Sequence, residues 1–225
     1  MNEIRYPVND CYTCVQGEGV QTGVAMVLLR LHGCEVGCPW CDTKETWEFH
    51  PENEVTSLDE ALGANSKYCW ETAETIADYI AQHHPGPKWV LITGGEPARY
   101  PLRPLVQALQ ARHYKVALET SGTETGHLDA PFDWVCVSPK LNMPGGKTVH
   151  LETLAHANEI KYVVGKSADI DRLDELLAQV HLQPDTWICL QPVSQSQKAT
   201  RLCLEIVQQR GWRLSLQTHK YLGVQ

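Results

Sequence analysis

Three closely spaced cysteines are the residues whose types and spacing most plainly suit chemistry. Cys34, Cys38 and Cys41 form a C-x3-C-x2-C pattern, and Gly33 and Gly37 beside them suit tight turns. The three thiolates can therefore converge on one metal centre. A structural zinc site usually takes four protein ligands, and no fourth Cys or His stands at a matching spacing, which leaves only a remote ligand. Three thiolates on an iron-sulfur cube would leave one iron open to chemistry, so the pattern favours an open cluster.

The other cysteines carry weaker signals. The chain has nine cysteines, an odd number that does not suit a complete set of intrachain disulfides. Cys11 and Cys14 form a C-x2-C pair that suggests a redox pair or half of a zinc site, but neither a second half-site nor a strand-to-helix context accompanies it. We therefore expect no special chemistry from this pair. The remaining four are scattered, and the last three lie in apolar patterns typical of core residues: Cys69, Cys136, Cys189 and Cys203.

The elements that must position the cysteine loop are short aliphatic strands with helices between them. Most of the strands are apolar throughout, which is typical of a parallel sheet covered by helices. We predict seven strands, at residues 24–31, 89–93, 114–120, 133–138, 160–165, 187–193 and 212–219. Helical spacing of apolar residues predicts helices at 72–83, 102–112, 169–180 and 197–209, and Gly211 suits the end of the last.

Strand and helix alternate along the chain, which predicts right-handed parallel crossovers and either a doubly wound sheet or a full or partial (β/α) barrel. Polar segments follow the strand ends repeatedly, and a site built from many strand ends is typical of barrels. We therefore predict an α/β fold, an incomplete (β/α) barrel of about six or seven mostly parallel strands. The polar segments expected on its rim are 32–34, 94–97, 121–123, 138–140, 191–195 and 217–220.

Length and charge set further limits. The 225 residues suit one domain, 1–225, and the weak periodicity of 44–70 predicts an insertion over the rim, although a surface excursion without function explains it equally well. A net charge of −8 has the wrong sign for a protein that binds a nucleic-acid backbone. No run approaches the length of a membrane helix, and the N-terminus lacks a signal-peptide layout, so we expect a cytoplasmic protein with reduced thiols.

The cysteine loop resembles that of the radical S-adenosylmethionine superfamily, in which the residue before the last cysteine is commonly aromatic, as Trp40 is here. The wider set of motifs resembles the 7-carboxy-7-deazaguanine synthase family in particular. This match runs nearly end to end and comprises Arg30 and the segments 16–19, 41–43, 93–97, 119–122, 138–140 and 217–220.

The resemblance implies a lyase of queuosine biosynthesis that converts 6-carboxy-5,6,7,8-tetrahydropterin to 7-carboxy-7-deazaguanine with loss of ammonia. It implies a 4Fe-4S cluster that reduces and cleaves S-adenosylmethionine, so that the resulting 5′-deoxyadenosyl radical takes a hydrogen from C6 of the pterin before the ring contracts. It also implies Mg2+ assistance, an external electron donor such as a flavodoxin, and a homodimer.

Position by position, the resemblance implies that Cys34, Cys38 and Cys41 hold the cluster and that Thr43 binds magnesium. The residues that would flank S-adenosylmethionine are Trp40, Cys41, Asp42, Gly95, Ser138, Pro139, Lys140 and Gln191. The residues that would contact the substrate are Val15, Gln16, Gly17 and Glu18 at the pterin ring, Arg30 and Thr93 at the carboxylate, and His219. For His219 the alternative is an ordinary polar residue near a frayed C-terminus.

One departure from the family pattern is Cys14, where Thr or Ser is expected, and it bears only on local packing. Two other functions remain open from the sequence. A glycyl-radical-enzyme activase shares the cysteine spacing and small size but acts on a protein backbone. A zinc-stabilised binding module would use the same thiols without catalysis.

Overall fold

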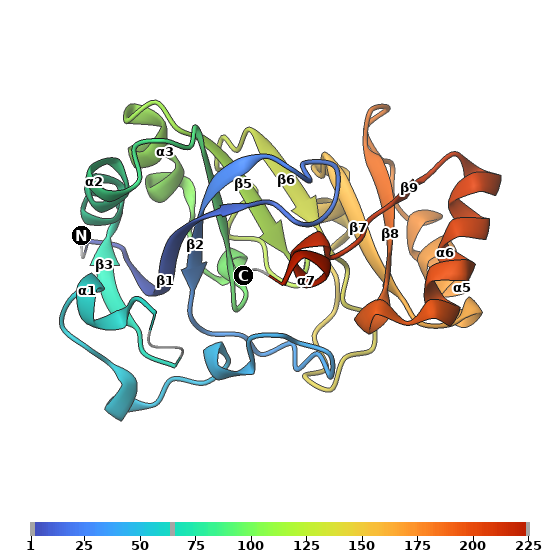
Figure 1. Cartoon of the computed structure of the whole chain (residues 1–225), viewed down its shortest axis with the longest axis horizontal. Coiled ribbons are helices and arrows are strands. Elements are labelled where there is room, and N and C mark those ends of the chain that lie inside the picture. Colours follow the sequence, from blue (N-terminus) through green and yellow to red (C-terminus); the bar gives the residue numbers. More distant parts are fainter. Residues whose placement is uncertain (1–2, 64–65, 224–225) are drawn as a thin grey trace.

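An open, curved sheet is the framework of the chain (Figure 1). The computed structural model describes residues 3–63 and 66–223, and within them nine strands form one sheet in the order β3-β1-β2-β4-β5-β6-β7-β8-β9. The strands are β1 (Arg5–Val15), β2 (Ala25–Leu31), β3 (Cys69–Thr72), β4 (Trp89–Gly94), β5 (Lys115–Thr120), β6 (Trp134–Val137), β7 (Glu159–Val164), β8 (Trp187–Pro192) and β9 (Arg213–Leu214).

Each pair of neighbouring strands from β2 to β9 in this order is parallel. The strand β1 runs antiparallel to both of its neighbours, β2 and β3. The strands β3 and β9 lie at the two ends of the order and do not pair with each other, so the sheet stays open. The prediction of an incomplete (β/α) barrel is therefore confirmed, with seven consecutive parallel strands to which β1 and β3 are added by antiparallel pairing.

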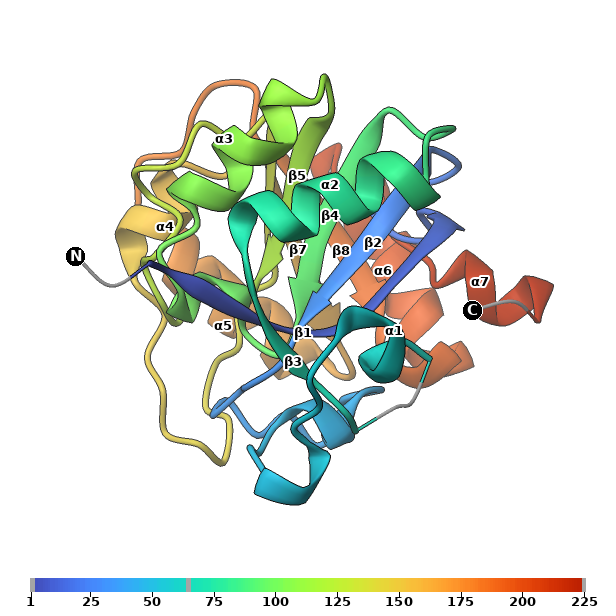
Figure 2. The same ribbon diagram turned by 90° about the vertical axis from the view of Figure 1, so that its left-hand side faces the viewer.

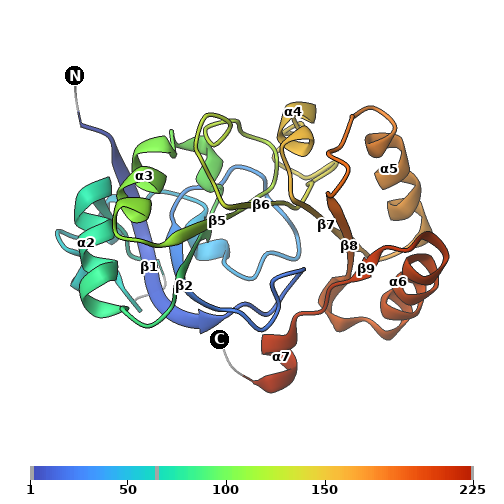
Figure 3. The ribbon, with the colours of Figure 1, turned by 90° about the horizontal axis from the view of Figure 1, so that it is seen from above.

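Helices cover the outer, convex face of the sheet, as Figure 3 shows from above and Figure 2 from the side of α2 and α3. Each buries the apolar stripe that its sequence predicts; in α2, for example, Ile76, Ala77 and Ile80 are buried. Gly211 ends α6 in the left-handed conformation, at φ 68°. The longer helices are α2 (Ala73–His83), α3 (Arg103–Ala111), α5 (Ser167–Leu177) and α6 (Gln197–Arg210).

Shorter helical turns lie in the connections. They are α1 (Leu58–Ala61), α4 (Leu151–Ala155), α7 (Thr218–Leu222) and the 3-10 turns Lys44–Thr46, Pro51–Asn53, Pro97–Arg99 and Val193–Gln195. Within the described residues, no helix is both long and apolar enough to cross a membrane.

The predicted strands differ from the structure at three places. The strand predicted at 212–219 ends at Leu214, and α7 takes up residues 218–222. The strands β1 and β3 were not predicted: β1 contains Pro7 and has an irregular register between Val8 and Asp10, and β3 has only four residues. A strand is recognised in a sequence by the regular alternation of apolar and polar residues. A proline and an irregular register interrupt that alternation in β1, so its sequence does not predict a strand.

The segment 44–70 is hydrogen-bonded to the cysteine loop. The carbonyl of Thr46 accepts a hydrogen bond from the amide of Gly33 at 2.7 Å, and that of Trp47 accepts one from Cys34 at 3.0 Å. The segment ends inside β3, which pairs with β1. The described residues do not include residues 64–65 of this segment. They also do not include residues 1–2, which belong to the N-terminus that we expect not to be a signal peptide.

The parallel register brings the strand ends to one rim. Arg30 pairs with Thr93, and Leu31 with Gly94, where β2 and β4 end together. Side chains alternate along a strand, so Met26 and Arg30 lie on the concave face while Val27 and Leu29 join the main core under the helices. In Figure 1 the light-blue segment that follows β2 runs below these strand ends.

A buried histidine makes the stability of this fold depend on pH. His127, in the loop after β5, is 2% exposed, and neither ring nitrogen has a hydrogen-bond partner among the described residues. Burial, with a smaller effect of His156, lowers its pKa to about 4. The pKa of a histidine in an unfolded chain is near 6.5. As the pH falls from 6.5 toward 4, His127 is therefore protonated in the unfolded state but stays neutral in the folded state, which favours unfolding.

We therefore expect the free energy of unfolding to drop by about 2 kcal/mol between pH 7.5 and pH 5 because of His127 alone. Urea unfolding of His127→Leu should show a pH dependence smaller by that amount than the wild type. The exposed His181→Leu serves as the matched control and should keep the wild-type dependence. An identical pH dependence in wild type and His127→Leu would contradict the account.

Candidate functional site

A cavity of about 700 Å³ opens on the concave face of the sheet at the carboxyl ends of the strands. Its walls come from the segment after β1, the cysteine loop, the ends of β4 through β8 and the C-terminal segment. Of the predicted site residues only Pro139 does not line it, although its two neighbours do. The others meet there: Val15, Gln16, Gly17, Glu18, Arg30, Cys34, Cys38, Trp40, Cys41, Asp42, Thr43, Thr93, Gly95, Ser138, Lys140, Gln191 and His219.

The cysteine loop leaves β2 through a turn that its glycines allow. Gly33 and Gly37 adopt φ of 98° and 72°, a region that residues with a Cβ rarely occupy. The amide of Cys41 donates to the carbonyl of Cys38 at 3.1 Å, which closes a turn between two of the three thiols. All three cysteines are free and line the cavity.

The donor set fits an iron-sulfur cube. Each cysteine of a cubane site binds a different iron, so the thiols must face a shared space rather than surround one point. Within residues 3–63 and 66–223, no three His, Cys, Asp or Glu side chains come close enough to hold a single metal ion. Burial raises the pKa of Cys34 to about 11 and also raises that of Cys38, so ligation must displace a proton from each thiol.

The Gly-Gly-Glu-Pro segment after β4 packs directly against the cysteine loop. The Gly95 amide donates to the Leu31 carbonyl at 2.8 Å, and the Glu96 amide donates to the Gly33 carbonyl at 2.8 Å. The Glu96 carboxylate is buried and accepts hydrogen bonds from the Thr120 hydroxyl at 2.6 Å and from the Ser121 amide at 2.7 Å. Glu96 therefore ties the ends of β4 and β5 together beneath the loop.

The Ser-Pro-Lys segment after β6 forms the next part of the wall. The Ser138 amide donates to the Thr120 carbonyl at 2.7 Å, and Lys140 donates to the Ser138 carbonyl at 2.9 Å and to the Ser138 hydroxyl. Burial lowers the pKa of Lys140. From β8, the side-chain oxygen of Gln191 accepts a hydrogen bond from the Ser215 hydroxyl at 2.7 Å.

The C-terminal segment holds the segment after β1 against the cavity. The Thr218 amide donates to the Gly17 carbonyl at 2.9 Å, and the Gly19 amide donates to the Ser215 hydroxyl at 2.8 Å. A Cβ on Gly17 would lie 2.4 Å from Nδ1 of His219, so the imidazole packs on the glycine. His219 thus packs on Gly17 in the cavity wall.

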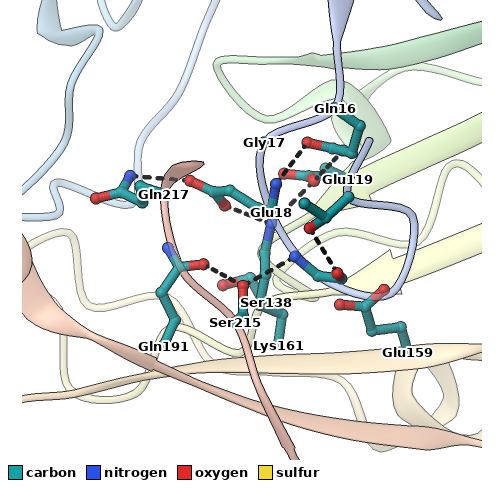
Figure 4. Close-up of polar contacts among 12 residues, drawn as sticks. Gln16, Gly17, Glu18, Glu119, Ser138, Glu159, Lys161, Gln191, Ser215 and Gln217 are labelled. Carbon is teal, nitrogen blue, oxygen red and sulfur yellow. Dashed lines mark hydrogen bonds and ion pairs between the residues drawn. The ribbon is translucent and has the colours of Figure 1, made fainter. Parts of the chain in front are cut away.

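A buried ionic network crosses the floor of the cavity, and Figure 4 shows its side chains pointing toward one another. Lys161 Nζ lies 2.6 Å from Glu18 Oε2 and 2.9 Å from Glu119 Oε1. The side-chain amide of Gln217 donates to Glu18 Oε1 at 2.8 Å, and that of Gln16 donates to Glu119 Oε1 at 3.1 Å. Of these, Lys161, Glu119 and Gln217 were not predicted as site residues.

A signal for Lys161 exists in the sequence. It is a charged residue inside the apolar run 160–164, a predicted buried strand, and a buried lysine requires charged partners. Glu119 is likewise a charged residue in β5, where it directly follows an apolar run. The pattern could have marked both residues, but it could not have shown that they meet Glu18, since the three are far apart in sequence.

Four cations line the cavity of this acidic protein, namely Arg30, Lys140, Lys161 and Lys220. Lys161 pairs with two carboxylates, and Lys220 pairs with Asp42 at 2.9 Å. In the part of the chain that the structure describes, Arg30 and Lys140 form no ion pair with a carboxylate. Two positive charges are therefore available to an anionic ligand.

Comparisons with known proteins agree with this geometry. A family model described as "4Fe-4S single cluster domain" matches residues 15–138, more than half of the chain. The chain is 44% identical to 7-carboxy-7-deazaguanine synthase of Escherichia coli (strain K12), with 98% of this chain and 100% of that one covered. It is 36% identical to the synthase of the same name from Buchnera aphidicola subsp. Schizaphis graminum, over 97% of this chain and 99% of the relative.

A solved structure is also similar. The crystal structure of QueE from Escherichia coli superposes with a TM-score of 0.87 at 43% identity, covering 94% of this chain and 93% of that one. The similarity in fold thus extends over most of the chain.

Proposed function

The chain belongs to the 7-carboxy-7-deazaguanine synthase family of radical S-adenosylmethionine enzymes, and from that membership we propose how its cavity residues share the work. It is a lyase of queuosine biosynthesis with a 4Fe-4S cluster and S-adenosylmethionine as cofactors. The observation that carries the assignment of roles is the meeting of three free thiols, two unpaired cations and a buried carboxylate network in one cavity.

Cys34, Cys38 and Cys41 hold the cluster on this proposal, because they are the three cysteines of one loop and all line the cavity. When bound, the cluster supplies the electron that cleaves S-adenosylmethionine and so begins radical chemistry on the substrate. The chain's part is to leave the fourth iron without a side-chain ligand and to keep water from the reacting groups.

The residues around the loop would bind S-adenosylmethionine. Gly95 lines the cavity where the Gly33 backbone packs too closely for a Cβ, and the Lys140 ammonium offers a partner for the carboxylate of the amino acid. The other proposed residues of this subsite are Trp40, Cys41, Asp42, Ser138 and Gln191, which line the cavity, and Pro139, whose two neighbours line it.

The substrate carboxylate would lie at Arg30 and Thr93, which the register places side by side at the ends of β2 and β4. Arg30 fits this role because it is charged and free of carboxylate partners in the described part of the chain. The ring would lie against Val15, Gln16, Gly17 and Glu18, with His219 packed beside them.

Magnesium would bind at Thr43, next to the last cysteine of the loop. A single hydroxyl is a weak magnesium ligand, so water and the substrate carboxylate would complete the shell. We also propose an external one-electron donor such as a flavodoxin, because the cofactor needs a reducing electron, and assembly as a homodimer.

Anaerobic turnover tests the proposed function. The reconstituted enzyme with 6-carboxytetrahydropterin, S-adenosylmethionine, a reductant and Mg2+ should yield 7-carboxy-7-deazaguanine and ammonia, read by mass spectrometry. Omission of Mg2+ should lower the rate. Reductive cleavage of S-adenosylmethionine without any deazaguanine product would contradict the substrate assignment and favour a radical enzyme with another substrate, such as a glycyl-radical activase.

A further inference from the structure

Lys161 is the point at which the polar network of the cavity is held together (Figure 4). Its side chain, on β7, is 3% exposed and reaches Glu18, in the segment after β1, and Glu119, on β5. Three elements that are distant in sequence thus converge on one ammonium group. The carboxylates are more open than the lysine, with exposed fractions of 16% for Glu18 and 24% for Glu119.

We propose that Lys161 is a positioning residue for substrate recognition, which holds the carboxylates of Glu18 and Glu119 side by side as charged acceptors for the N–H groups of a flat heterocycle. This inference rests on the proposed function, in which the heterocycle is the pterin ring. Lys161 itself does not touch the substrate on this proposal, because its ammonium is occupied by the two carboxylates.

The open acceptor in the network is an oxygen of Glu119. Oε1 of Glu119 takes the hydrogen bonds from Lys161 and from Gln16. Among the described residues no group donates to Oε2, and the side chain lines the cavity. An ionised carboxylate only accepts hydrogen bonds, so a ligand that satisfies Oε2 must present a donor such as a ring N–H or an exocyclic amine.

The lysine is needed because the two carboxylates share one nitrogen and are therefore close to each other. Two carboxylates in a partly buried site do not both stay ionised unless a cation lies between them. A protonated carboxyl would turn an acceptor into a donor and lose a ligand that brings N–H groups. Lys161 thus sets which hydrogen-bonding pattern the cavity recognises.

The surrounding charges act in the same direction. Burial opposes the charge of Glu18, but the ammonium of Lys161, with Gln217 and His219, brings the pKa of Glu18 down to about 2. Burial also opposes the charge of Lys161, and Glu119 and Glu18 nevertheless raise its pKa well above the usual value. The other titratable groups facing Lys161 are Cys136 on β6, Glu159 on β7, Cys189 on β8 and, after β6, Lys140.

The variant Lys161→Met tests the proposal, because it keeps the length of the side chain and removes the charge. We expect the KM for the pterin to rise about tenfold or more, since a lost charged hydrogen bond at the ligand costs on this scale. The acid limb of kcat/KM against pH should move to higher pH, because a carboxyl without its cation gains a proton more easily. Reductive cleavage of S-adenosylmethionine without pterin should stay at the wild-type rate.

The double variant Lys161→Met with Glu119→Gln guards against loss of folding, since it removes one charge of each sign. It should return the acid limb toward the wild-type position while the KM stays raised. Lys198→Met, at an exposed residue of α6, is the matched control and should change neither quantity. Iron content and thermal unfolding confirm that the variants are folded.

The outcomes separate this inference from the proposed function. A wild-type enzyme that makes no deazaguanine product overturns both. A wild-type enzyme that turns the pterin over, together with a folded Lys161→Met whose KM and acid limb are unchanged, overturns only the role of Lys161. A raised KM with no shift of the acid limb would show a merely structural brace and would also overturn it.

Discussion

Cys38→Ala should leave the enzyme without its cluster and without turnover. Cys38 is buried in the cavity wall. On the proposed function it is one of three cysteines that bind the cluster, and its removal leaves only two. Because the cofactors supply the difficult chemistry, the rate should fall by roughly a thousandfold or more. Iron and sulfide analysis, visible absorbance and the turnover assay, all under anaerobic conditions, measure the loss.

A second cysteine variant shows whether that loss is specific. Cys203 is completely buried in α6, among core residues and outside the cavity wall. Cys203→Ala should lower the free energy of unfolding by about 1 kcal/mol, as a small core truncation does, and should keep iron and activity. A Cys38→Ala enzyme that retains turnover would contradict the cluster assignment.

Gly95→Ala should disable the site through backbone contact alone. A Cβ at this position would lie 2.4 Å from the Gly33 carbonyl oxygen and 2.7 Å from the Gly33 carbonyl carbon, so the cysteine loop would have to move. The hydrogen bond from the Glu96 amide to the same carbonyl would be disturbed as well. A displacement of about 1 Å at reacting groups can cost on the order of 100-fold, and we expect a loss of kcat/KM at least that large.

Gly86→Ala is the matched control for this substitution. Gly86 lies in the connection before β4, has nothing within 4 Å of an added Cβ and has no positive φ. Its activity and its affinity for S-adenosylmethionine should equal those of the wild type. Wild-type activity in Gly95→Ala, measured under saturating S-adenosylmethionine, would show that the loop does not depend on this contact.

The parallel part of the fold could be predicted because each of its strands is a short apolar run in the sequence. The runs that became β2 and β4 through β8 are mostly apolar, as burial under helices requires, and some of the few charged residues in them, such as Lys161, face the cavity. The strand β1 could not be predicted in the same way, since Pro7 and the irregular pairing near Asn9 break the pattern. Its place in the sheet depends on pairing with β2 and β3, which a local pattern does not contain.

The same contrast applies to the site. The cysteine loop could be found in the sequence because its three cysteines lie within a stretch of eight residues. The network of Lys161, Glu18 and Glu119 could not, because it exists only when the segment after β1 meets β5 and β7. Pro139 was predicted with its neighbours Ser138 and Lys140, but only the two neighbours line the cavity.

The central claim is that three cysteines hold a cluster whose fourth iron is open to S-adenosylmethionine. Electron paramagnetic resonance of the anaerobically reduced protein, recorded with and without S-adenosylmethionine, tests it most directly. The account predicts the signal of a reduced 4Fe-4S cluster that changes when S-adenosylmethionine is added. A signal that does not respond, because a side chain of the protein fills the fourth position, or a protein that takes up no iron, would contradict it.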